Sequence, residues 1–98
     1  MKIALDEKAV EWFKKELDFP ENKALRFYVR YGGDVNLKQG FSPAFTVDTV
    51  DPEGYSETQS GLTYYVDEKD LWYYEDHILN VTCKNDEIEY SISNNIES

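Results

Sequence analysis

Cysteine and histidine are scarce in this sequence, which contains one of each, Cys83 and His77. A single cysteine cannot form an intramolecular disulfide or complete a thiolate metal site within one chain. A single histidine cannot form the histidine pair of many zinc sites, and no serine lies in the Gly-x-Ser-x-Gly sequence of serine hydrolases. We therefore expect a protein that is not an enzyme and has no cofactor, with His77 at a surface or strand edge.

Basic residues are also few. Ten lysines and arginines stand against twenty aspartates and glutamates, so the net charge is -10 at pH 7. This charge repels nucleic acids and anionic membranes, and we expect neither as a partner. An unidentified protein partner of basic character fits this negative charge better. The charge is also explained if it serves only to keep the protein soluble. Long apolar runs are absent, including the run of a signal peptide, and we expect a cytoplasmic protein.

Hydrophobic residues make up 41% and aromatic residues 15% of the 98 residues, which is enough to form the core of one domain, residues 1–98. Apolar residues at helical spacing predict an amphipathic helix over residues 6–17. Asp6 stands at its N-cap position, and Pro20 prevents a long continuation.

Apolar and polar residues alternate in several later segments, as is typical of strands. A short helix is expected within residues 67–76, loops over residues 32–43 and 56–61, and a tight turn at residues 84–86. The pattern predicts a mainly β, α+β protein with strands at residues 24–31, 44–50, 62–66, 78–83 and 87–92.

Three groups of residues were considered for function. Gly32 and Gly33 suit a turn with positive φ or a close backbone approach. Acidic residues within 67–70 could hold a hard cation, but acids at a helix start more often face solvent beside the helix dipole. A cluster of aromatic residues could line a ligand pocket, although in so small a domain it favours the core; its members are Tyr64, Tyr65, Trp72, Tyr73 and Tyr74.

Four segments follow one another in a recognisable order: the predicted helix at residues 6–17, the strand and glycine pair at 25–33, the loop end at 40–42, and residues 66–71. In their order and spacing they resemble the HesB-like domain of the A-type iron-sulfur carriers, a family of iron-sulfur cluster biosynthesis. The resemblance implies curled β-sheets that form a pseudo-barrel, with an N-terminal amphipathic helix and a short second helix. It also implies metal binding by one cysteine after the glycine pair and by a Cys-x-Cys pair near the C-terminus.

That cysteine motif is degenerate in this chain. Asp34 occupies the first cysteine position, and residues 93–98 contain no cysteine. Cys83 matches none of the three positions; strand alternation places it beside Leu79 and Val81, in the apolar core. Because iron-sulfur clusters usually need four thiolates, we expect no cluster on this chain.

Two hypotheses remain open. The first is a non-catalytic binding or adaptor protein, monomeric or weakly homodimeric, that contacts its partner through the loop. The second is an accessory protein in iron-sulfur cluster assembly that handles iron through carboxylates, with Asp34 as the candidate metal ligand. The predicted partner-binding residues of the first hypothesis are Gly33, Asp34, Asn36, Lys38, Gln39 and Phe41.

Overall fold

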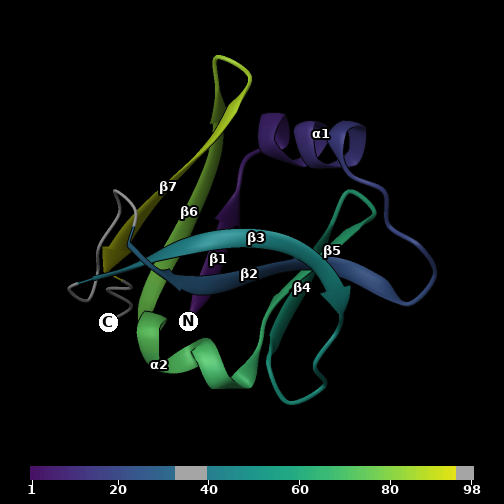
Figure 1. Ribbon diagram of the computed structural model, residues 1–98. Helices are drawn as coiled ribbons and strands as arrows, with labels where there is room; N and C mark the ends of the chain where they lie inside the picture. The colour runs from purple at the N-terminus through teal and green to yellow at the C-terminus, as the bar shows by residue number, and fades with distance from the viewer. Residues whose placement is uncertain (33–39, 95–98) are drawn as a thin grey trace.

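The computed structural model describes residues 1–32 and 40–94 and contains two β-sheets and two α-helices (Figure 1). Parallel pairing joins β1 to β6 and β2 to β5, and the other neighbouring strands are antiparallel. The predicted α+β class is confirmed. One sheet has the order β1 (Lys2–Leu5), β6 (His77–Lys84), β7 (Glu87–Asn94), and the other β3 (Phe41–Thr49), β2 (Lys23–Tyr31), β5 (Leu62–Val66), β4 (Tyr55–Gln59).

The first helix, α1 (Glu7–Glu16), begins as predicted. The carboxylate of Asp6 accepts a hydrogen bond from the backbone N–H of Ala9 at 2.7 Å, a cap that typically contributes about 1 kcal/mol. Val10 and Phe13 are buried on the face toward the sheets, so the amphipathic pattern and the packing agree.

The strand predicted at residues 44–50 begins earlier than expected. β3 starts at Phe41, directly opposite Tyr31 of β2, so Phe41 belongs to a strand rather than to the loop. Pro43 is tolerated within it because β3 is an outer strand of its sheet. A proline lacks the backbone N–H, and the groups along the outer edge of such a strand are not needed for pairing within the sheet.

A strand that the sequence pattern did not predict, β4, lies where a loop was expected. β4 is an outer strand of its sheet and is mostly polar. Two of its polar side chains form hydrogen bonds to the other sheet. Glu57 accepts a hydrogen bond from the backbone N–H of Ile3 at 3.4 Å, and Gln59 donates one to the carbonyl of Leu5 at 2.9 Å. At this seam the sheets meet through side chains, and the described strands do not form the closed pairing of a barrel.

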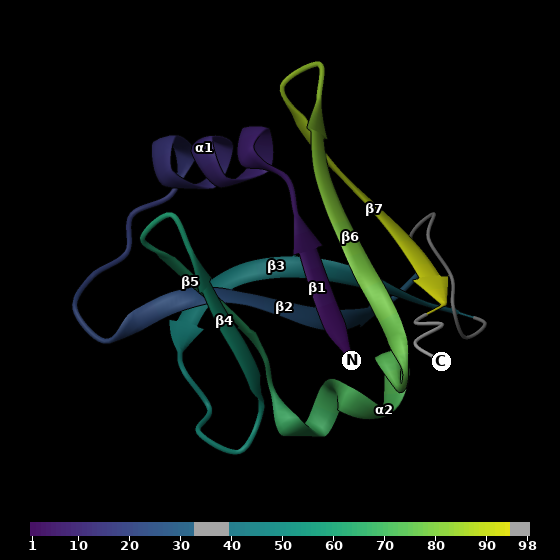
Figure 2. The ribbon, with the colours of Figure 1, turned by 180° about the vertical axis from the view of Figure 1, so that it is seen from behind.

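The core lies between α1 and the two sheets. Figure 2 shows the arrangement of these elements from behind. Four of the five clustered aromatic residues belong to it: Tyr64, Tyr65, Tyr73 and Tyr74 are at most 1% exposed. The core interpretation is confirmed for these four. It is wrong for Trp72, which is 47% exposed.

The remaining predictions concern local turns. The short second helix is present as a 3₁₀ turn (Glu68–Asp70) followed by α2 (Leu71–Tyr74). Asn85 and Asp86 have φ of 54° and 63°, as the tight hairpin turn between β6 and β7 requires. Among the described helices, none is long and apolar enough to span a membrane.

Candidate partner-binding surface

Three aromatic side chains meet at the end of the β2–β3 pair. The rings of Tyr31 and Phe41 lie 5.6 Å apart and those of Phe41 and Trp72 5.5 Å apart, both edge to face. Tyr31 is 81% exposed, and it and Trp72 are the large exposed apolar side chains of the described residues. We call these three residues the aromatic patch. Adjoining exposed aromatic side chains are typical of surfaces that bind a partner.

The strand ends beside the aromatic patch have a fixed backbone. Gly32 and Gly40 have φ of 98° and 87°, and the N–H of Gly32 donates to the carbonyl of Gly40. The hydroxyl of Ser42 donates to the carbonyl of Gly32. A Cβ at Gly40 would lie 3.0 Å from the ring of the exposed Tyr31, which would have to shift, and the positive φ of Gly40 favours glycine. The predicted positive φ is confirmed at Gly32.

The third aromatic residue of the patch comes from a different part of the chain. Trp72 is carried by α2, and the neighbouring Tyr73 donates its hydroxyl hydrogen bond to the backbone carbonyl of Phe41 at 2.9 Å. This bond ties α2 to the start of β3. The aromatic patch is therefore built on three elements, with β2 and β3 joined by strand pairing and α2 joined to β3 by the Tyr73 hydrogen bond.

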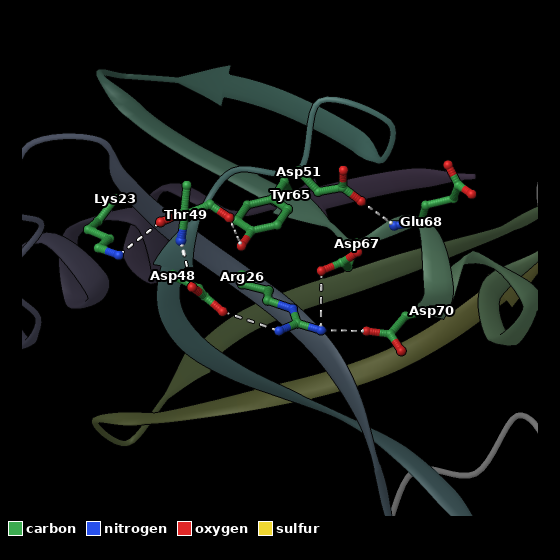
Figure 3. A network of polar contacts seen from close by, with 9 residues as sticks. All are labelled: Lys23, Arg26, Asp48, Thr49, Asp51, Tyr65, Asp67, Glu68 and Asp70. Carbon is green, nitrogen blue, oxygen red and sulfur yellow. Dashed lines mark hydrogen bonds and ion pairs between the residues drawn. The ribbon is translucent and has the colours of Figure 1, made fainter.

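Arg26 anchors the segment before α2 from inside the molecule (Figure 3). Its guanidinium lies 3.3 Å from the carboxylate of Asp48, 3.2 Å from that of Asp70 and 3.5 Å from that of Asp67. The side chains of Arg26 and Asp70 are only 14% and 12% exposed. Burial opposes the charge of Arg26, but the hydrogen bond to Asp70 and the nearby Asp67 raise its pKa.

This network corrects the sequence interpretation of the acidic residues within 67–70. Asp70 does not face solvent as a helix-dipole residue; it is a buried ion-pair partner of Arg26. The pairing was not predicted because Arg26 and Asp70 lie 44 positions apart in the chain. Alternation along β2 by itself indicates only that Arg26 points to the opposite side from Leu25 and Phe27.

Asp51 and Asp67 share a hydrogen bond at the edge of the same network. The carboxylate of Asp51 accepts from the backbone N–H groups of Glu68 and Glu53, each at 3.0 Å, and these bonds lower the pKa of Asp51. Burial, and the hydrogen bond that the protonated Asp67 donates to Asp51, raise the pKa of Asp67. As pH falls, Asp67 therefore takes up a proton before Asp51 does.

The carboxylates around Arg26 are not arranged as a metal centre. Within residues 1–32 and 40–94, no group of three or more histidine, cysteine or acidic side chains is placed to hold a metal ion. A cation would also have to displace the guanidinium that already neutralises them. The arrangement instead fixes the position of α2 against β2.

The predicted site residues are placed only in part. Gly33, Asp34, Asn36, Lys38 and Gln39 lie outside the described residues, whereas Phe41 lies at the centre of the aromatic patch.

The sequence analysis did not assign the other two members of the patch to partner binding. Strand alternation puts Tyr31 on the same side as Phe27, but β2 extends beyond the core at that end, and Tyr31 is exposed. Clustered aromatic residues were the available signal for Trp72.

Two further residues were considered for chemistry. His77 begins β6, half-buried, with its Nδ1 2.9 Å from the carbonyl of Tyr74. Cys83 packs on the core side of β6, as predicted, but it is half-exposed rather than buried. The reason is that β6 runs past the core toward the hairpin turn, where Cys83 lines a groove with Trp12 and Lys8.

Comparison with known sequences gives close relatives of almost the same length. The uncharacterized protein SH1556 of Staphylococcus haemolyticus is 56% identical over 96 residues, which cover 93% of this chain and 97% of the relative. The uncharacterized protein SAUSA300_1248 of Staphylococcus aureus is 54% identical over 96 residues, 93% of this chain and 98% of the relative. This chain belongs to their family. No broader family model matches the sequence.

A solved structure relates the SH1556 family to a known fold. The crystal structure of Escherichia coli SufA, described as involved in biosynthesis of iron-sulfur clusters, superposes with a TM-score of 0.61 over 96% of this chain and 86% of SufA. The two sequences are 12% identical, so the likeness shows the fold alone. The fold resemblance inferred from sequence is thereby supported.

Proposed function

We propose that this protein is a non-catalytic, protein-binding adaptor on a SufA-like fold. The observation that carries the proposal is the aromatic patch, in which Tyr31 and Trp72 are exposed while Phe41 joins them. Tyrosine and tryptophan are enriched among the residues that dominate binding energy at protein interfaces. The predicted role of Phe41 in partner binding is part of this proposal.

The charge around the aromatic patch indicates the character of its partner. Glu75 and Asp76 follow α2 directly and are exposed, and the whole chain has a net charge of -10. A complementary partner surface would have an apolar centre and a basic rim. The opposite charges of the two surfaces would speed association, and an acidic partner would be repelled. An unidentified basic protein remains the partner that we propose, with the adaptor as a monomer or weak homodimer.

Removing the exposed rings tests the adaptor directly. In Tyr31→Ser/Trp72→Ser we expect a loss of at least about tenfold in the amount of specific partner retained on an affinity column, because two interface anchors are lost. The matched control Tyr31→Phe/Trp72→Phe keeps the apolar rings and should retain the partner. Equal capture by the serine and phenylalanine variants would contradict the proposal, once circular dichroism has shown that both are folded.

The alternative of iron handling is tested by anaerobic reconstitution with iron and sulfide. We expect no stable cluster after desalting, because one thiol is present where clusters usually need four thiolates. Asp34→Cys alone should give none either, since residues 93–98 still lack cysteine. Absorption spectra and metal analysis provide the measurement. Stoichiometric iron and sulfide on the unaltered chain would favour the iron-handling hypothesis over the adaptor.

A further inference from the structure

β7 is an outer strand of its sheet. Both ribbon views place β7 at the outside of its sheet, next to β6 alone (Figures 1 and 2). The two-residue turn pairs Lys84 with Glu87, so that pair exchanges both hydrogen bonds and the following pairs alternate. The N–H and C=O groups that point away from β6 are those of Ile88, Tyr90 and Ile92.

These outward backbone groups have no backbone partner among residues 1–32 and 40–94. β7 is eight residues long and contains no proline or lysine, the residues that commonly protect an edge strand. The edge can therefore accept another strand in regular hydrogen-bonded register.

A cleft lies beside this edge. It has a volume of about 470 Å³, and its walls are the first half of β7, Arg30 of β2, and Ser42 and Pro43 of β3. Pro43 has no N–H to donate, so β3 is poorly suited to pair with an added strand. Of the two strands that line the cleft, β7 is therefore the better partner for an added strand. The side chain of Tyr90 reaches from β7 to the core, where its ring lies 6.3 Å from that of Phe27.

The two faces of β7 define the sequence of a fitting strand. Ile88, Tyr90 and Ile92 are half-buried on the core face, whereas Glu87 and Glu89 are exposed on the other. A neighbouring strand would place apolar residues beside the first set and cationic residues beside the glutamates, each favourable pair contributing about 0.2–1 kcal/mol. A second copy of this chain would bring further acidic side chains to an acidic edge, which disfavours self-pairing.

We propose that the edge of β7 is a β-augmentation site, which takes an extended segment of a partner protein with alternating basic and apolar residues as an additional strand. Main-chain hydrogen bonds provide affinity in this mode, and alternate side chains provide specificity. None of the residues of the aromatic patch takes part. The proposed site on β7 can therefore be tested separately from the proposed role of the patch.

A synthetic peptide of eight residues, alternating lysine and valine with blocked ends, is the probe, and a glutamate–valine peptide is its counterpart. We expect the lysine peptide to bind the unaltered protein and to lose at least about tenfold in affinity for Glu87→Lys/Glu89→Lys, because attractive cross-strand pairs become repulsive. The glutamate peptide should prefer that variant. Glu16→Lys/Glu53→Lys changes the net charge equally at exposed sites elsewhere and should bind the lysine peptide like the unaltered protein.

Amide hydrogen exchange supplies the structural readout. On peptide binding, the amides of Ile88, Tyr90 and Ile92 should gain at least about tenfold protection, while those of Glu89 and Ser91, which already face β6, stay unchanged. Equal loss of binding in the control variant would show diffuse charge attraction and overturn the site. So would unaltered exchange at the three amides, or protection that rises with protein concentration without peptide, which would assign the edge to a second copy. Tyr31→Ser/Trp72→Ser should bind the peptide normally.

Discussion

Replacing Arg26 with methionine is expected to lower the free energy of unfolding by about 3 kcal/mol, the usual cost of breaking a buried ion pair from one side. Methionine keeps much of the apolar stem but leaves the carboxylate of Asp70 buried without its cation. Asp48 and Asp67 lose the same partner, so their mutual repulsion is no longer compensated. Urea denaturation followed by circular dichroism measures the change.

Arg30→Met provides the matched control, because Arg30 lies on the same strand with its side chain exposed. Its unfolding free energy should change by less than about 0.5 kcal/mol. Arg26→Met/Asp70→Leu should recover part of the loss, since it removes the stranded carboxylate as well as its partner. If Arg26→Met and Arg30→Met had the same denaturation midpoint, the network would not support the fold in the way described.

Alkaline pH is expected to unfold this protein over a narrow range that starts near pH 10. Burial raises the pKa of Tyr65 to about 12, and burial also raises the pKa of Tyr64 and of Tyr74. An unfolded tyrosine has a pKa of about 10, so above that pH the unfolded chain releases protons that the folded chain keeps. The stability is fully present below pH 10 and falls as pH rises toward the folded pKa values.

Between the unfolded and the folded pKa of a buried tyrosine, the free energy of unfolding falls by about 1.4 kcal/mol per pH unit for that group, and the losses of several buried tyrosines add. Because an ordinary domain has a stability of only about 5–15 kcal/mol, such a summed loss is enough to unfold it. Absorbance at 295 nm reports tyrosinate and circular dichroism reports folding, and we expect the two transitions to coincide for the buried tyrosines.

Tyr74→Phe separates this linkage from loss of packing. The hydroxyl of Tyr74 is buried without a hydrogen-bond partner among the described residues, so its removal should cost little at pH 7. The variant has one fewer buried phenol, and its stability should fall less steeply above pH 10, by about 1.4 kcal/mol per pH unit. An unchanged alkaline slope, or complete tyrosinate formation in the still-folded protein, would refute the proposed linkage.

The elements that were predicted correctly are those set by neighbours in the chain. The N-cap of α1 depends on Asp6 and Ala9, three positions apart, and the hairpin turn depends on Asn85 and Asp86 alone. β4 was not predicted because its polar residues bond to a strand more than fifty positions away, through Glu57 and Gln59. Periodicity detects an apolar face, whereas the half-buried face of this outer strand carries Glu57 and Gln59.

The sequence by itself determined the α+β class, the ends of α1, the buried tyrosines and the shortage of thiolates, because each follows from local spacing or from composition. Only the tertiary structure decided that Arg26 neutralises Asp70, that Tyr31, Phe41 and Trp72 adjoin, and that β7 is an outer strand among the described strands. These features join residues far apart in the chain, and the position where a strand leaves the core fixes which side chains reach solvent. No period of two or 3.6 residues carries that information.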